Sequence, residues 1–266
     1  MGKTLGAAMD FQTITYQMTD GVAVIGLNRP EVMNALSSRL RAEMLTAVLR
    51  ATAEARVLVI TGHGRAFCSG QDLMDAGPLA KLDLEAVLNE EYVPLLTAIT
   101  ESPIPTIAAV NGAAAGAGAN LALAADVVIA SESASFIQAF TRIGLVPDAG
   151  GSYWLPRQIG MARAMGAVLF ADKVSARQAA EWGMIYECVA DAEFETHWQT
   201  RAKALANGPT AAYRGVKTAM RASFDNDLSA QLALEARLQG ACGATTDFRE
   251  GVAAFLEKRA AKFRGC

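Results

Sequence analysis

Cysteine is scarce in this sequence, and neither sign of charge dominates it. The four cysteines lie far apart, at Cys68, Cys188, Cys242 and Cys266, and form no CxxC pair. This spacing argues against a zinc site or a disulfide framework and favours reduced thiols. A formal net charge of −3 argues against a basic face for nucleic acid or an anionic membrane. No apolar run is free of charges and helix breakers over the length of a membrane span, and the first residues lack a signal-peptide core. We therefore expect a cytoplasmic protein with no metal site and no nucleic-acid or membrane partner, in which the first eight or nine residues form a lead-in.

The order of apolar patterns predicts an α/β fold. The chain has 266 residues, of which 52% are hydrophobic, so it can bury the core of one large domain or of a domain with a small appendage. Residues 13–28 contain two β-rich runs joined at Asp20-Gly21, which predicts a hairpin. A helical pattern with a serine cap and a buried strand follow, over 37–55 and 56–61. Strand, helix and strand then recur over 105–112, 116–126 and 127–136, which indicates parallel strands linked by helical crossovers.

The C-terminal part of the chain has a different character. Strand patterns fade from about residue 194, and helical periodicity continues to residue 263. We place a boundary near residues 195–205 and predict two regions, a core over 1–200 and a helical region over 201–266. The amphipathic helices of this second region carry more apolar surface than a tail needs, which favours assembly into a trimer or a dimer of trimers.

Two segments rich in small residues run from a buried strand into glycine and alanine, over 57–73 and 107–126. Without bulky side chains, both segments can present bare main-chain amides to a ligand. The second segment resembles a dinucleotide fingerprint but has Leu121 where the third glycine would stand, and no phosphate loop is present. The alternative is that the small residues only allow close packing of strand and helix.

A single acid, Asp148, stands in the otherwise apolar, aromatic or glycine-rich run 144–156. Its apolar neighbours would raise the pKa of the carboxyl group and strengthen it as a base. The alternative is that Asp148 caps a turn before Gly150-Gly151.

Six segments together resemble the crotonase, or enoyl-CoA hydratase/isomerase, superfamily over nearly the whole chain. They are "LNRPEVMNAL", "ITGHGRAFCSGQDL", "PTIAAVNGAAAGAGANLALAAD", "SFIQAFTRIGLVPDAGGSYWLPRQIG", "SARQAAEWGMI" and "FREGVAAFLEKR". Within the superfamily, "GLVPDAGGSYWLP" and "MARAMGAVLF" are similar to isomerases of aerobic phenylacetate degradation, which convert ring-1,2-epoxyphenylacetyl-CoA to an oxepin. The resemblance implies a crotonase-type spiral of ββα units, a C-terminal helical trimerisation region and coenzyme A thioester substrates.

The resemblance also implies roles for individual residues. The family's two oxyanion amides, which hold the thioester carbonyl as it becomes an enolate, fall on Gln71 and Ala117. The two glutamates that activate water in family hydratases fall on Asn120 and Phe140, and neither of these can transfer a proton. The single carboxylate of family isomerases falls on Asp148. Asn120 would then orient substrate or water, or only satisfy local hydrogen bonds, and Phe140 would line an acyl pocket or the core.

Coenzyme A binding is implied for a further set of positions. The loop Ala66, Cys68, Ser69 and Gly70 would lie along the adenine and pantetheine, and Arg29 would lie near the entrance. Phe255 and Lys258 would reach the nucleotide bound by a neighbouring subunit. For Arg29 and Lys258 the alternative is that they are ordinary solvated charges. Coenzyme A enters as part of the substrate, so we expect no separate cofactor. Acyl specificity is expected to depend on the loop 74–92, and we interpret His63 and His197 as structural.

Three functions remain open from the sequence. The first is an acyl-CoA isomerase that uses Asp148, the second an enoyl-CoA hydratase with another arrangement for activating water, and the third a non-catalytic acyl-CoA-binding protein. Product analysis separates them, because isomerisation, hydration and binding without turnover give different outcomes.

Overall fold

The computed structural model describes residues 10–75 and 83–266. Strands β1 (Ile14–Thr19) and β2 (Val22–Leu27) form the predicted antiparallel hairpin, with Thr19 opposite Val22. Asp20 and Gly21 between them have φ values of 50° and 80°, as a tight two-residue hairpin turn requires. The expected lead-in falls on residues 1–9, and part of the expected specificity loop on residues 76–82, which lie outside the described residues.

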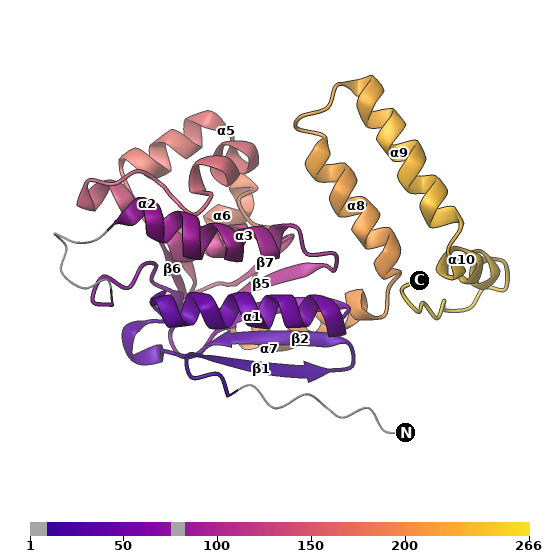
Figure 1. The fold of residues 1–266 in the computed structure, drawn as a ribbon, viewed down its shortest axis with the longest axis horizontal. Coiled ribbons are helices and arrows are strands. Elements are labelled where there is room, and N and C mark those ends of the chain that lie inside the picture. Colours follow the sequence, from indigo (N-terminus) through magenta and orange to yellow (C-terminus); the bar gives the residue numbers. More distant parts are fainter. Residues whose placement is uncertain (1–9, 76–82) are drawn as a thin grey trace.

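A six-stranded sheet in the order β1-β2-β3-β5-β7-β10 forms the centre of the molecule (Figure 1). From β2 onward its strands are parallel: β3 (Val57–Gly62), β5 (Thr106–Val110), β7 (Val127–Ser131) and β10 (Glu187–Val189). Helix α1 (Ser38–Glu54) makes the first crossover, and Ser37 caps it by accepting a hydrogen bond from the Leu40 amide. Alternate residues of the strands are buried in two clusters, so both faces of the sheet are covered.

A second, four-stranded sheet lies beside the first. It contains β4 (Ala66–Cys68), β6 (Ala113–Ala115), β8 (Ser135–Ile137) and β9 (Val174–Ser175), in that order. Three times the chain leaves a strand of the large sheet and enters a strand of the small one, which is the repeating unit of a ββα spiral. The prediction of one strand over 127–136 is therefore wrong in one respect. A turn near Ser133 divides it into β7 and β8, which belong to different sheets.

Short helices connect the two sheets and surround the small-residue segments. The 3-10 turn η1 (Pro30–Val32) lies between β2 and α1. Later in the chain, the short helix α2 (Leu84–Val87) continues through a π-helical turn η3 (Leu88–Tyr92) into α3 (Val93–Thr100). Helix α4 (Ala117–Leu123) follows β6 directly. The 3-10 turn η4 (Ala139–Ile143) and the long helix α5 (Gly151–Leu169) flank the segment that carries Asp148, and α6 (Ala176–Trp182) follows β9.

The last four helices divide between the core and an extension. Helix α7 (Asp191–Ala206) packs on the large sheet through the buried Phe194 and Trp198, so the predicted division after residue 200 falls inside this helix. Helices α8 (Thr210–Ala222), α9 (Leu228–Gly243) and α10 (Thr246–Leu256) extend away from the sheets (Figure 1). In the described ranges, every helix is too short or too polar to cross a membrane.

Candidate active site

Asp148 lies on a tight turn between η4 and α5. Ala149 and Gly150, which follow it, have φ values of 47° and 84°, and the helix begins at Gly151. The Asp148 side chain is half-buried, and its Oδ1 atom is buried without a hydrogen-bond partner in the described residues. Burial raises the pKa of the carboxyl group from 3.8 to about 6. A carboxylate with such a pKa accepts protons readily near neutral pH.

Asn120 fixes the turn from the side of α4. Its Nδ2 atom donates to the Asp148 carbonyl oxygen at 2.7 Å, and its Oδ1 atom accepts from Gln138 Nε2 at 2.9 Å. The side chain is fully buried, and a Cβ atom on Gly151 would lie 2.4 Å from its nitrogen. Asn120 thus supports Asp148 through the main chain, and a glycine is needed where α5 passes it.

The two small-residue segments meet in space. A Cβ atom on Gly70 would lie 2.7 Å from the Ala115 carbonyl oxygen and 3.4 Å from the Ala117 nitrogen. A Cβ atom on Gly118 would lie 2.4 Å from the Cys68 carbonyl oxygen. In the part of the chain that the structure describes, the main-chain N–H groups of Gln71 and Ala117 have no acceptor. Two adjacent segments therefore offer two free main-chain donors, which is the requirement for holding an anionic oxygen.

The side chain of Gln71 belongs to a partly buried polar network. Its Oε1 atom accepts hydrogen bonds from the Tyr92 hydroxyl and, at 3.0 Å, from Arg41 Nη1. Arg41 is 2% exposed, pairs with Glu91 at 2.7 Å, and lies 4.7 Å above the centre of the Tyr92 ring. Burial raises the pKa of Tyr92, and the neighbouring Arg41 charge opposes this effect in part.

Arg41 and Tyr92 were not predicted as site residues. Arg41 does give a signal in the sequence, because it interrupts the apolar stripe of α1 that includes Leu40 and Met44. A charged side chain on the buried face of a helix needs a partner inside the protein. Tyr92 gives no comparable signal in the sequence.

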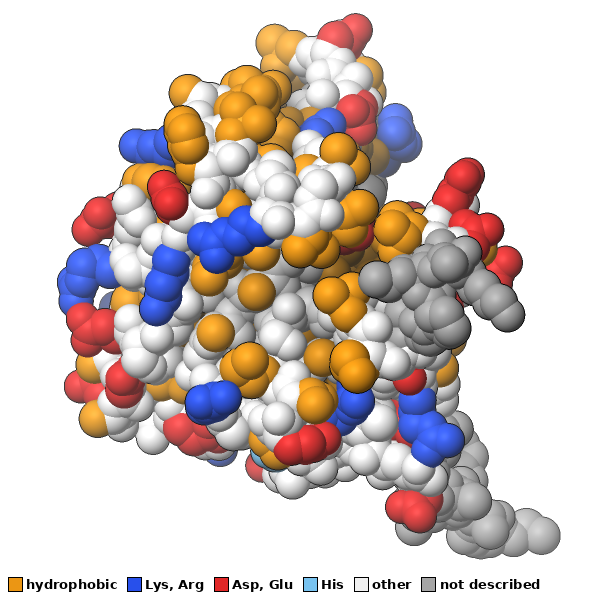
Figure 2. Space-filling model, turned by 90° about the vertical axis from the view of Figure 1, so that its left-hand side faces the viewer, with side chains coloured by type: hydrophobic (Ala, Val, Ile, Leu, Met, Phe, Trp, Pro, Cys, Tyr) orange, Lys and Arg blue, Asp and Glu red, His pale blue; other side chains and the backbone are white. Residues whose placement is uncertain are grey.

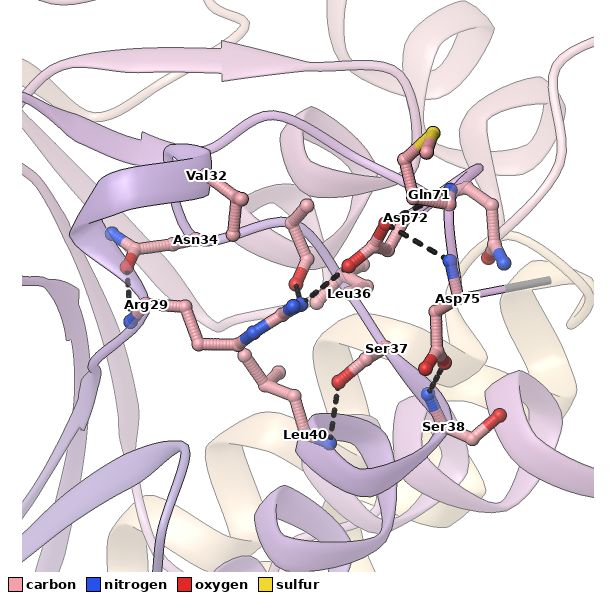
Figure 3. A network of polar contacts seen from close by, with 12 residues as sticks. Arg29, Val32, Asn34, Leu36, Ser37, Ser38, Leu40, Gln71, Asp72 and Asp75 are labelled. Atoms are coloured by element: carbon pink, nitrogen blue, oxygen red, sulfur yellow. Dashed lines mark hydrogen bonds and ion pairs between the residues drawn. The ribbon is translucent and has the colours of Figure 1, made fainter. Parts of the chain in front are cut away.

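Arg29 forms an ion pair that shapes the segment before Gln71. Its Nη1 atom donates to Asp72 Oδ2 and to the Ala35 carbonyl oxygen, both at 2.7 Å. Figure 3 shows that Asp72 points toward Arg29 while the side chain of Gln71 points the other way, as expected for neighbours in an extended chain. Asp72 Oδ1 also accepts from the Asp75 amide. The charge of Arg29 is therefore paired inside the protein.

The other predicted substrate-binding residues lie in two places. Ala66, Cys68 and Gly70 are buried beside α4, and Ser69 is half-buried. Burial raises the pKa of the Cys68 thiol to about 12. Phe140 is 6% exposed, and its ring would lie 3.7 Å from a Cβ atom on Gly116, so it covers the start of α4.

Phe255 and Lys258 are not brought to this site within one chain. They lie at the end of α10, which Figure 1 shows apart from α5. The two histidines make local contacts: His63 with the Thr15 hydroxyl at 2.8 Å, and His197 with Glu187 at 2.9 Å.

Comparison of the sequence and the fold with known proteins identifies similar enzymes. The family model described as enoyl-CoA hydratase/isomerase matches residues 17–265. A protein of Rhodobacter capsulatus named "Probable enoyl-CoA hydratase" is 63% identical over 97% of this chain and 100% of its own length. The 1,2-epoxyphenylacetyl-CoA isomerase of Escherichia coli is 43% identical over 92% of this chain and 95% of its own length. The crystal structure of an enoyl-CoA hydratase from Bacillus anthracis has a TM-score of 0.89 at 33% identity, covering 96% of this chain and 100% of that one.

Proposed function

Because the chain belongs to the enoyl-CoA hydratase/isomerase family, we propose that it isomerises an acyl-coenzyme A thioester with Asp148 as the proton-transferring group. The observation that carries the proposal is the half-buried Asp148, whose Oδ1 atom has no partner among the residues that the structure describes and whose pKa is raised by burial. Isomerisation needs one base, which removes a proton from the carbon next to the thioester and returns it elsewhere on the acyl group. The substrate is thus a thioester with an acidic proton beside its carbonyl, such as a 3-enoyl-CoA or a ring epoxide.

The two free main-chain donors of Gln71 and Ala117 would stabilise the intermediate. As the proton leaves, the electron pair moves to the thioester oxygen, and both N–H groups would hold the resulting enolate. Loss of one such donor typically costs about 3 kcal/mol of transition-state stabilisation. The enolate then collapses, the double bond shifts, and Asp148 gives the proton back. No redox step occurs, so we propose that no cofactor is needed besides the coenzyme A of the substrate.

Hydration is the second candidate function. The 63% identical relative is named a hydratase, which favours it. Two features of the site count against it: Asn120 is fully buried and bonded to the Asp148 carbonyl, and Phe140 is an apolar ring beside Gly116. Neither residue can activate water, so a hydratase would need Asp148 to act alone.

An assay with two thioesters tests the proposal. The protein should convert trans-3-hexenoyl-CoA to its 2-enoyl isomer and exchange the proton next to the carbonyl with deuterium in D₂O. Asp148→Asn should lose both activities while it still binds the thioester. Rapid hydration of crotonyl-CoA without isomerisation would favour the hydratase, and binding without any turnover would favour an acyl-CoA-binding protein.

We also propose that the protein assembles as a trimer, or a dimer of trimers, in the cytoplasm. Large apolar side chains on the last three helices are exposed, among them Met220, Leu232 and Phe255. Part of this surface lines a groove of about 910 Å³ between α8, α9 and α10. Figure 2 shows further apolar side chains in the upper part of another face. Helix α5 also carries exposed apolar side chains, among them Met161 and Met165. Apolar surface of this extent is typical of subunit contacts. In such an assembly Phe255 and Lys258 would reach a nucleotide bound by a neighbouring subunit. A monomer measured by light scattering would contradict the proposal.

A further inference from the structure

The Gln71 carboxamide has one possible orientation. Arg41 Nη1 and the Tyr92 hydroxyl both donate to its Oε1 atom. A guanidinium carries donors only, so the carboxamide oxygen must face it. The NH₂ group of Gln71 is therefore turned away from Arg41.

In the described part of the chain, the NH₂ group of Gln71 has no hydrogen-bond partner. Among residues 10–75 and 83–266 Gln71 Nε2 makes no hydrogen bond, and this nitrogen is not one of the buried unpartnered atoms. The residue as a whole is half-buried. Gln71 thus holds two N–H bonds at a fixed place that solvent can reach, as a binding site does for an oxygen of its ligand.

The arrangement that holds the carboxamide is costly to build. Arg41 is 2% exposed, and its Nε and Nη2 atoms donate to Glu91 at 2.9 and 2.7 Å. Burying the Arg41 guanidinium costs desolvation free energy, and its pairing with the partly exposed Glu91 offsets this cost only in part. Glu91 and Tyr92 also lie on a π-helical turn, a rare conformation that is frequent at functional sites. A role in the site explains this cost better than a role in stability.

The position of the carboxamide relates it to the reacting end of the substrate. The main-chain N–H of the same residue is one of the two free donors next to the Gly116 segment. Gly70, the residue before Gln71, packs against Ala115 and Ala117, and Asn120 on the same helix α4 donates to the Asp148 carbonyl at 2.7 Å. An oxygen on the acyl group near the thioester would therefore lie within reach of a glutamine side chain.

We propose that the Gln71 carboxamide recognises acyl groups that carry an oxygen close to the thioester, such as an ether, epoxide or hydroxyl oxygen. The inference rests on the proposed function, because it assumes that an acyl-CoA occupies this site. Gln71 donates one hydrogen bond to that oxygen, and Arg41 and Tyr92 are the positioning residues that keep the donor in place. A hydrocarbon chain would leave the donor desolvated and without a partner, which disfavours its binding.

Binding of two matched, unreactive thioesters tests this inference by calorimetry. In 3-methoxypropanoyl-CoA an ether oxygen takes the place of one methylene group of pentanoyl-CoA. Gln71→Glu keeps an oxygen toward Arg41 and replaces the NH₂ donor with a negatively charged carboxylate oxygen. Gln71→Met removes the donor without adding charge. Both variants should shift the ratio of the two dissociation constants toward pentanoyl-CoA by about 3- to 10-fold, the value of one neutral hydrogen bond. Gln17→Glu makes the same chemical change on the exposed part of β1 and should leave the ratio as it is.

The outcomes separate the two levels of the argument. If both thioesters bind and the Gln71 variants weaken them equally, the side chain has only a structural role and the inference is overturned. If neither thioester binds the parent protein, the proposed function fails and the inference fails with it. If Gln71→Met does not fold, Gln71→Glu decides the question, because it retains the contacts with Arg41 and Tyr92.

Discussion

Replacing Asp148 with asparagine is expected to stabilise the protein at pH 8 while it slows isomerisation strongly. The carboxyl group is half-buried, Oδ1 has no partner in the described residues, and burial raises its pKa from 3.8 to about 6. The folded protein therefore holds this proton more tightly than the unfolded chain does. The stability contributed by the neutral carboxyl is complete below pH 3.8 and is lost as the pH rises through about 6.

The size of the effect follows from the shift. One pKa unit corresponds to about 1.4 kcal/mol, and solvent reaches part of this side chain and screens its charge. We expect ionised Asp148 to cost about 1–2 kcal/mol of unfolding free energy at pH 8. Asparagine cannot ionise and avoids this cost, whereas its kcat should fall by about 10²-fold or more because the base is gone.

Urea unfolding at pH 8 and pH 5, together with the 3-enoyl-CoA assay, measures both effects. The stability difference between Asp148→Asn and the parent should be larger at pH 8 than at pH 5, and the parent's kcat/KM should rise with pH through about 6. Asp172→Asn changes an exposed carboxylate and serves as the control. A variant that is no more stable than the parent at pH 8, or that keeps the parent's kcat, would refute the reasoning.

Three further predictions concern Asn120, Gly70 and the cysteines. Asn120→Ala removes the hydrogen bonds to the Asp148 carbonyl and to Gln138, so the free energy of unfolding should fall by about 1–3 kcal/mol. The kcat should also fall, and unchanged kinetics would show that Asp148 needs no support from Asn120. Gly70→Ala places a Cβ atom 2.7 Å from the Ala115 carbonyl oxygen, in a backbone conformation with a φ of 93° that alanine adopts only with strain. The kcat/KM should therefore fall about 10²-fold, and parent-like kinetics would contradict the close approach of the two segments. Iodoacetamide at pH 8 should modify the exposed Cys266 and spare Cys68, whose thiol pKa is about 12, and mass spectrometry of the native protein reads both sites.

Local patterns were enough to predict much of the fold. The hairpin at Asp20-Gly21 and the helix capped by Ser37 are confirmed, because turn chemistry and a capping side chain act over a few residues. The division of 127–136 into β7 and β8 was missed, since both halves are apolar and only tertiary pairing assigns them to different sheets. The small sheet was missed because its strands have only two or three residues each, which is too short for a recognisable pattern.

The candidate site could be predicted only in part. An acid in an apolar run drew attention to Asp148, and the burial and raised pKa agree with the chemistry expected of it. The support from Asn120 is made with a main-chain carbonyl, and a sequence carries no mark of such a bond. The Arg41–Tyr92–Gln71 network joins residues up to 51 positions apart, so only the folded chain brings them together.

The two free donors of this site belong to the peptide backbone, and this limits how they can be studied. Every amino acid except proline supplies the same N–H group, so other substitutions at Gln71 or Ala117 would leave both donors in place and report only on side chains. The proposed anion-holding element would escape detection by ordinary mutagenesis, and replacement of one peptide bond by an ester would be needed to delete a single donor. The same property would allow side chains around the site to diverge, and with them the acyl group, without loss of the element proposed to hold the thioester oxygen.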